Sequence, residues 1–137
     1  LPALADLSGQ VFPQPPLVFI RVGPEVHLFA LKEDRRPGPD TPLHLAPYFN
    51  YHGGRRGWVC WGNGPVPEGG ERNNPEAWEA AFFAGAFSHV GENPLRRGSL
   101  PQLWRKLAGR KRFPTGRLKE AGLTLGEAVA LLLGGRA

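Results

Sequence analysis

The sequence predicts an α+β domain in which an antiparallel β-meander precedes the helices. Two runs rich in β-branched and aromatic residues, LVFIRV and VHLFAL, occupy residues 17–22 and 26–31. The three residues between them include a glycine and a proline, which is typical of a β-hairpin. Signals for helix capping begin only after residue 73. Strands that precede helices, instead of alternating with them, favour an antiparallel sheet with helices against one face or end.

Two further strands are expected before the first helix. Residues 43–50 (LHLAPYFN) predict a third strand. Its Pro47 must lie at an edge or at the end of the strand, because proline cannot donate to a ladder. Residues 51–56 predict a turn, and GWVCW at 57–61 predicts a short apolar strand. A long loop rich in glycine and proline is expected over 62–74.

Three helices are expected in the second half of the chain. Asn74 is a suitable N-cap with Pro75 at the first helical position, and apolar spacings of three and four continue to about Val90. A second helix begins after Ser99, which matches a capping box with Gln102. Its buried face is expected to consist of Leu100, Leu103, Trp104 and Leu107.

The third helix and the two ends of the chain complete the expected organisation. Thr124 and Glu127 match a second capping box, and the helix is expected to end at Gly134-Gly135. Residues 1–16 hold four prolines without periodicity and predict an irregular arm. The length of 137 residues suits a single domain. The sequence contains no Met. We therefore expect either that the initiating Met was removed or that the sequence is a fragment of a longer chain.

Composition excludes several classes of protein. The longest apolar run is residues 128–133, far shorter than the roughly 20 residues that a membrane span needs. No segment resembles a signal peptide, and no membrane partner is expected. The single cysteine excludes an internal disulfide framework and a cysteine-rich zinc site. We therefore expect a cytoplasmic protein without a metal or other cofactor.

Positive charge is concentrated in residues 96–119, which hold nine Lys or Arg residues and no Asp or Glu. The rest of the chain has eight basic and twelve acidic residues, from 17 − 9 = 8 against 12. Three interpretations stay open for this basic segment. It is a solvated face near a helix end, where cations suit the dipole; it binds an acidic protein; or it binds nucleic acid, although no recognition motif accompanies the charge.

Cys60 is the strongest candidate for a catalytic residue. It ends an apolar segment directly before a loop rich in glycine and proline, which would place the sulfur at a rim. If residues 43–50 and 57–61 pair, the side-chain amide of Asn50 would lie near the sulfur. An amide donor beside a thiol suits acyl transfer, because it can stabilise a developing oxyanion. The alternative is a buried cysteine that only packs, since free cysteine is among the most buried residue types.

The stretch PYFNYHGGRRGWVCW (47–61) resembles the active-site region of ubiquitin-conjugating enzymes. In that family a His-Pro-Asn tripeptide precedes a Gly-x-Val/Ile-Cys-Leu segment. Tyr48 and Phe49 stand where His-Pro would be, and the gap to the cysteine is slightly longer. The positions that match the family are Asn50, Gly57, Val59 and Cys60.

The sequence is more similar to a divergent prokaryotic branch of that superfamily, family D. This branch includes protein B of the PRTRC cassette, which is named for its ParB-related and ThiF-related members. It lacks the usual His and has instead a His on the C-terminal side of the cysteine. The matching residue is His89, within AFFAGAFSHV (81–90), and the closing GLTLGEAV (122–129) is also similar. The resemblance covers residues 17–133 and implies a ubiquitin-conjugating-enzyme-like fold.

The resemblance also implies an acyl relay. A ThiF-like activating enzyme would carry a small ubiquitin-like protein as a thioester, and the Cys60 thiolate would take the acyl group from it. An amine would then receive the group. His89 would deprotonate this amine or orient the site, and Asn50 would steady the oxyanion. The partner would consume ATP, and Cys60 itself would need no cofactor.

Two other functions stay open. A non-catalytic relative with the same fold would serve as an interaction module, and Cys60 and His89 would then face no common groove. A nucleic-acid-binding accessory protein would use residues 96–119, and its affinity would fall steeply with salt. His89 itself could be a packing or capping residue on an amphipathic helix.

Overall fold

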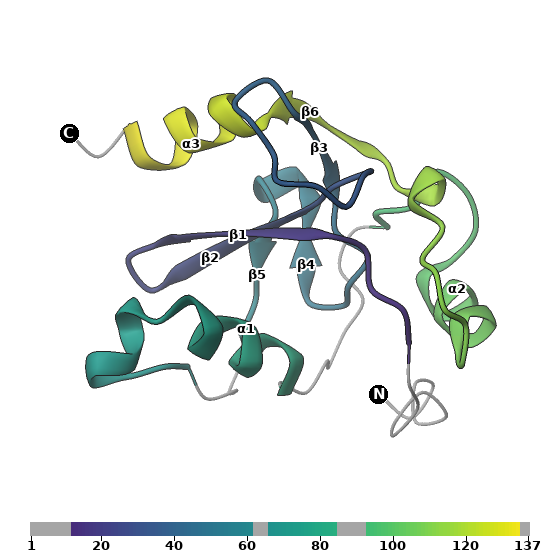
Figure 1. Ribbon diagram of the computed structural model, residues 1–137, viewed down its shortest axis with the longest axis horizontal. Coiled ribbons are helices and arrows are strands. Elements are labelled where there is room, and N and C mark those ends of the chain that lie inside the picture. The colour runs from purple at the N-terminus through teal and green to yellow at the C-terminus, as the bar shows by residue number, and fades with distance from the viewer. Residues whose placement is uncertain (1–11, 62–65, 85–92, 135–137) are drawn as a thin grey trace.

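The computed structural model describes residues 12–61, 66–84 and 93–134. Within these ranges six strands form one antiparallel sheet, and three α-helices surround it (Figure 1). The strands are β1 (Leu17–Val22), β2 (Glu25–Ala30), β3 (Pro42–Leu45), β4 (Tyr51–His52), β5 (Trp58–Val59) and β6 (Glu120–Thr124). The helices are α1 (Pro75–Ala84), α2 (Leu100–Leu107) and α3 (Leu125–Leu133). The predicted α+β class is confirmed.

The hairpin of β1 and β2 is the longest pairing in the sheet and confirms the prediction for this part of the chain. The two strands pair along their full length, from Leu17 opposite Ala30 to Val22 opposite Glu25. The turn is shorter than expected, because Glu25 already belongs to β2. Gly23 adopts a φ of 61°, as the first central residue of a two-residue hairpin turn often does.

The sheet follows the order β4-β5-β2-β3-β6, with β1 on the other edge of β2. The second edge of β2 is therefore shared by two strands in succession. His27 faces Trp58 of β5, and Phe29 and Ala30 face β3. The antiparallel arrangement is as predicted, but the chain does not pass simply from one strand to its neighbour. This branching brings β5, which precedes Cys60, against the middle of the sheet.

The predicted strand over residues 43–50 is wrong in its extent. β3 ends at Leu45, and the chain enters a separate short strand at Tyr51, inside the segment that was expected to be a turn. The break coincides with Pro47, which has no N–H to donate. Its carbonyl oxygen instead accepts a 2.8 Å hydrogen bond from the indole N–H of Trp104 on α2. At Pro47 a hydrogen bond from a helix distant in the sequence therefore takes the place of hydrogen bonds between strands.

Strand β6 was not predicted from the sequence. This strand lies between α2 and α3 and pairs with β3, with His44 opposite Glu120 and Pro42 opposite Thr124. Its sequence, EAGLT, contains a glycine and lacks the alternation that marks a strand. The order of strands first and helices afterwards therefore has this one exception among the described residues.

The helix N-termini follow the predicted capping. The amide of Glu76 donates to Asn74 Oδ1 at 3.1 Å at the start of α1. The amide of Gln102 donates to Ser99 Oγ at 3.3 Å at the start of α2, which is the Ser99 half of the predicted capping box. The expected continuation of α1 to Val90 lies outside the described residues. All four residues predicted for the inner face of α2 are buried: Leu100, Leu103, Trp104 and Leu107.

The capping box of α3 is complete. Thr124 Oγ1 accepts from the amide of Glu127 at 3.2 Å, and the Glu127 carboxylate accepts from the amide of Thr124 at 2.9 Å. The helix ends at Leu133, where Gly134 is the C-cap, as predicted. No helix within the described ranges is long and apolar enough to cross a membrane.

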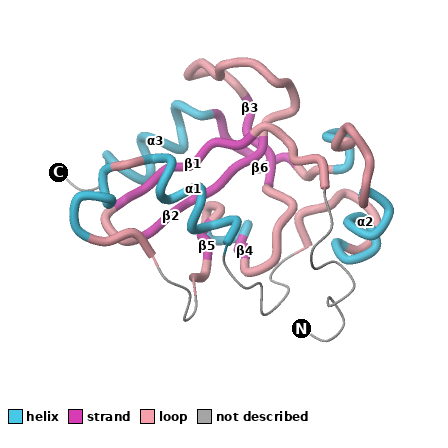
Figure 2. The backbone as a smooth tube through the Cα atoms, turned by 60° about the horizontal axis from the view of Figure 1, so that its bottom comes forward, coloured by secondary structure: helices cyan, strands magenta, loops and turns pink. Residues whose placement is uncertain are grey.

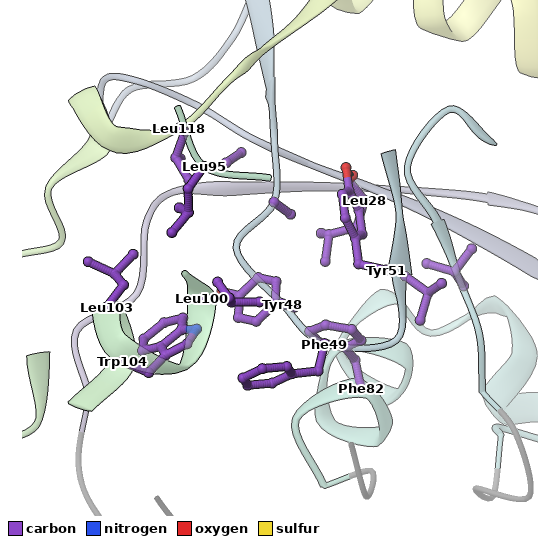
Figure 3. Packing of buried hydrophobic residues seen from close by; sticks show 14 of the residues in the cluster. Leu28, Tyr48, Phe49, Tyr51, Phe82, Leu95, Leu100, Leu103, Trp104 and Leu118 are labelled. Atoms are coloured by element: carbon purple, nitrogen blue, oxygen red, sulfur yellow. Dashed lines mark hydrogen bonds between the residues drawn. The ribbon is translucent and has the colours of Figure 1, made fainter. Parts of the chain in front are cut away.

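Helices cover both faces of the sheet, so the buried residues form two clusters. In β2, Val26, Leu28 and Ala30 belong to the larger cluster with α1 and α2, whereas Phe29 belongs to the smaller one with α3. This division follows from the alternation of side chains along a strand. Figure 2 shows α2 and α3 at opposite ends of the molecule. The larger cluster contains the aromatic residues next to the candidate site (Figure 3).

Candidate active site around Cys60

The short hairpin of β4 and β5 positions Cys60. Tyr51 pairs with Val59, and Cys60 follows β5 directly. The amide of Cys60 donates a 2.8 Å hydrogen bond to the carbonyl oxygen of Asn50. The two residues expected to lie together are therefore neighbours through their backbones. The pairing arises from β4, and not from a continuous strand over 43–50.

Gly57 allows this hairpin to lie against β2. It has a φ of 73°, and a Cβ at this position would lie 2.5 Å from the carbonyl oxygen of Leu28 and 2.9 Å from the hydroxyl of Tyr51. The Gly57 carbonyl accepts from the amide of Leu28 at 2.8 Å. The Tyr51 hydroxyl donates to the Leu28 carbonyl at 2.6 Å. Only glycine fits between these groups, so the residue three positions before the cysteine has a structural role.

Tyr48 anchors the segment that leads to Asn50. It is buried, and its ring lies 5.1 Å from that of Phe82 and stacks on Trp104 at 6.0 Å between centroids. The hydroxyl donates to Gln14 Oε1 at 2.6 Å. Burial raises the pKa of the Tyr48 phenol far above its usual range, so the group stays neutral. At the position where ubiquitin-conjugating enzymes have His, this chain has a packing residue.

Asn50 has a backbone role that the sequence did not indicate. Its φ is 58°, which lies in the left-handed region, and the residue is only 5% exposed. Asparagine tolerates this conformation better than most residues. The conformation turns the chain into β4, where the Asn50 carbonyl accepts from Cys60. That the Asn50 amide also stabilises an oxyanion stays a prediction.

Cys60 is a free thiol and is half-buried. The next residue, Trp61, packs edge-on against Trp78 and Phe82 of α1, with centroids 5.8 and 6.3 Å apart. Its indole N–H is buried and has no hydrogen-bond partner among the described residues. The thiol therefore follows a strand that pairs with both β2 and β4, and it precedes a residue that is held by aromatic packing, as a positioned nucleophile requires.

The other candidate, His89, lies outside the described residues, so its role stays a prediction. The remaining histidines belong to strands. His27 lies in β2, and its Nδ1 atom is 2.8 Å from the carbonyl oxygen of Arg56. His44 and His52 lie in β3 and β4. No group of three His, Cys, Asp or Glu residues in the described part of the chain is arranged to hold a metal ion.

The antiparallel sheet, the helices on both its faces and the half-buried cysteine at a strand end are consistent with a ubiquitin-conjugating-enzyme-like fold. Residues 4–121 match the family described as Prokaryotic E2 family D. The chain therefore belongs to this family, which confirms the branch that the cysteine segment resembles. Neither a curated protein nor a solved structure matched the chain.

Proposed function

We propose that the protein is a ubiquitin-conjugating-type acyl transferase. In the first step the Cys60 thiolate attacks the carbonyl carbon of a ubiquitin-like protein held as a thioester on a ThiF-like activating enzyme. A new carbon–sulfur bond forms, and the thiolate of the activating enzyme leaves. In the second step an amine attacks the new thioester and the Cys60 thiolate leaves. The amine proton passes to a base, for which His89 is the candidate.

The observation that carries this proposal is the hydrogen bond from the Cys60 amide to the Asn50 carbonyl oxygen. It ties the only cysteine of the chain to the residue that matches the family's asparagine. Cys60 is also half-buried and not paired in a disulfide. A thiolate is a potent nucleophile, and a thioester remains reactive towards amines. Family membership supports the same class of reaction.

The finer assignments rest on the sequence resemblance. We propose that Asn50 donates to the oxyanion in both steps, and that His89 serves the attack by the amine. We also propose that the chain corresponds to protein B of the PRTRC cassette and acts in the cytoplasm. ATP is consumed by the activating enzyme, and Cys60 needs no cofactor.

A non-reducing gel tests the proposal directly. The protein is mixed with a ThiF-like activating enzyme, a candidate ubiquitin-like protein and ATP. We expect an ATP-dependent adduct that disappears on addition of a thiol. Cys60→Ala should abolish the adduct. Cys60→Ser should give an adduct that resists thiols, because an alkoxide is a poorer leaving group than a thiolate.

Loading of the activating enzyme itself provides the internal control. If that enzyme carries the modifier and the wild-type protein still forms no adduct, the relay is wrong. Full conjugation by Cys60→Ala would also contradict it. Both outcomes would favour the alternative of a non-catalytic interaction module with the same fold.

A further inference from the structure

A polar hollow of about 450 Å³ lies beside β6. In the order of the strands, β6 is at the opposite end of the sheet from the β4–β5 hairpin that carries Cys60. The hollow is lined by residues of β3 and β6 and by three segments outside the strands, at Lys32, at Arg96 and at residues 115–119. None of its lining residues belongs to the proposed acyl-transfer site. The side chains that matter for the argument are Lys32, His44, Arg96, Thr115, Lys119 and Glu120.

His44 is an incompletely satisfied group in the wall of this hollow. It lies on β3 between Ala30 of β2 and Glu120 of β6, and it is 9% exposed. Its Nδ1 atom is buried and has no hydrogen-bond partner among the described residues. A buried polar atom without a partner costs free energy, so such atoms point to a missing partner. The His44 ring itself lines the hollow, so a ligand bound there would contact the ring.

The imidazole is held neutral by its surroundings. Burial lowers the pKa of His44, the nearby Lys32 charge lowers it further, and Glu120 partly opposes them. A neutral ring offers Nδ1 as a donor or as an acceptor, according to its tautomer. A neutral ring adds no charge to the wall, so the charged side chains alone set the sign of the charge in the hollow.

The charges around the hollow leave an excess of two positive charges. Lys32, Arg96 and Lys119 are cationic, and Glu120 is the one carboxylate in the lining. The ion pairs in the described part of the chain, His27–Glu25 and Arg35–Glu33, involve none of these four residues. A phosphate monoester carries about −1.5 to −2 charges near pH 7, whereas a carboxylate carries −1. The balance of charge therefore favours phosphate.

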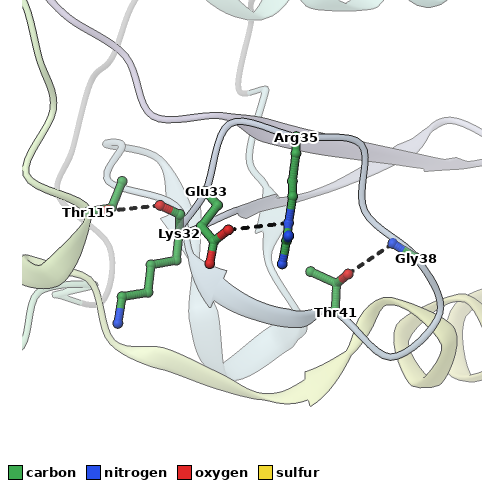
Figure 4. Close-up of polar contacts among 6 residues, drawn as sticks. All are labelled: Lys32, Glu33, Arg35, Gly38, Thr41 and Thr115. Atoms are coloured by element: carbon green, nitrogen blue, oxygen red, sulfur yellow. Dashed lines mark hydrogen bonds and ion pairs between the residues drawn. The ribbon is translucent and has the colours of Figure 1, made fainter.

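Backbone contacts hold the cationic residues in place. The Thr115 hydroxyl donates to the Lys32 carbonyl oxygen at 3.1 Å (Figure 4). The amide of Arg96 donates to the Arg117 carbonyl at 2.8 Å, and the amide of Lys119 donates to the Pro94 carbonyl at 2.9 Å. These bonds join three segments that are distant in the sequence. The arrangement is therefore built by the fold, and is not a run of neighbouring surface charges.

We propose that this hollow binds a phosphate group, either as free phosphate or as the phosphate of a small monoester. Arg96 pairs with its oxygens, and the His44 ring forms part of the wall. Lys119 Nζ donates to the Asn93 carbonyl oxygen at 3.0 Å and pairs with the phosphate through its other N–H groups. The volume leaves room for the body of a small monoester beside the phosphate. The inference is independent of the acyl-transfer function, since no residue is shared.

Calorimetric titration in a phosphate-free buffer at pH 7.5 tests the site, with inorganic phosphate and glycerol 3-phosphate as probes. We expect saturable binding of one phosphate per chain. Arg96→Gln should weaken it about tenfold, because hydrogen bonds between charged groups are the strong ones. Arg96→Lys should recover part of the loss. Tighter binding of glycerol 3-phosphate would identify a monoester as the ligand, and equal binding would identify free phosphate.

Lys111→Gln is the matched control, because this exposed lysine lies in the same basic segment but outside the hollow. Its affinity for phosphate should be unchanged. A ring-nitrogen NMR signal of His44 that moves on addition of phosphate would locate the ligand even if a variant unfolds. Equal losses in Lys111→Gln and Arg96→Gln, or an unchanged His44 signal at saturation, would overturn the site. Binding of duplex DNA that phosphate does not displace, without any binding of phosphate itself, would also overturn it.

Discussion

The amide of Cys60 donates a 2.8 Å hydrogen bond to the carbonyl oxygen of Asn50, which itself has a left-handed φ of 58°. One residue therefore has two separable roles. Its backbone conformation fixes the start of β4, and its side chain is the proposed oxyanion donor. A substitution at Asn50 is informative only if it distinguishes these roles.

The first prediction uses two substitutions of Asn50. Glycine keeps the left-handed conformation and removes the amide, whereas alanine removes the amide and strains the backbone by roughly 1–2 kcal/mol. If the amide is an oxyanion donor, both variants should discharge the thioester about a hundredfold more slowly. Single-turnover discharge to free lysine measures this rate, and thermal unfolding measures the strain. Wild-type discharge by Asn50→Gly would show that only the backbone role is real.

The second prediction concerns Gly57. In Gly57→Ala the new Cβ would lie 2.5 Å from the Leu28 carbonyl oxygen, in a backbone conformation that alanine disfavours. The hairpin that carries Cys60 must then move away from β2, and we expect a loss of about 3 kcal/mol or more in the free energy of unfolding. Urea denaturation measures it. Gly70→Ala is the control, because a Cβ there meets nothing within 4 Å, and a large loss in that variant would refute the explanation.

The parts of the fold that could be predicted depend on local signals. The β1–β2 hairpin, the N-caps at Asn74, Ser99 and Thr124, and the buried face of α2 follow from residues at fixed short spacings. The break after β3 could not be predicted in the same way. It depends on the hydrogen bond from Trp104 to Pro47, which joins residues 57 positions apart. β6 could not be predicted for the same reason. Its own sequence lacks the alternation of a strand, and its conformation depends on pairing with β3.

The Cys60 site and the hollow around His44 also differ in how far local sequence signals predict them. The neighbourhood of Asn50 and Cys60 was foreseeable, because a short turn separates the segments that contain them. The role of Tyr48 was not foreseeable, since its ring contacts come from α1 and α2. The hollow around His44 combines side chains from β3, β6 and three loop segments that no single motif joins. Charge concentration in residues 96–119 was the only hint of it.

The third prediction concerns His89 and follows from the sequence. If His89 accepts the proton of the attacking amine, His89→Ala should slow discharge of the thioester more than its formation. The deficit should shrink as the pH rises, because more of the amine is then already deprotonated. Discharge rates between pH 6.5 and 9 measure this dependence. A deficit that stays constant over this range would indicate a packing role instead.

The fourth prediction is a dependence of stability on pH that originates at His44. Burial lowers the folded-state pKa of this residue below the usual 6.5. The charge of Glu120 raises this pKa and partly opposes burial, whereas the charge of Lys32 lowers it further. In the window between the folded pKa and 6.5, the unfolded chain binds more protons than the folded one. Stability contributed by His44 must therefore rise with pH through this window, and fall as the solution is acidified below about pH 6.5.

His44→Gln removes this contribution while keeping a polar side chain. Carboxylates elsewhere titrate in both proteins, so the informative quantity is the difference in Tm between wild type and variant, measured from pH 4.5 to 7.5. The wild type should lose more on acidification than His44→Gln. The measurement requires buffers without phosphate, since a bound phosphate would itself stabilise the wild type. Parallel curves for the two proteins would show that the imidazole is not held neutral by burial.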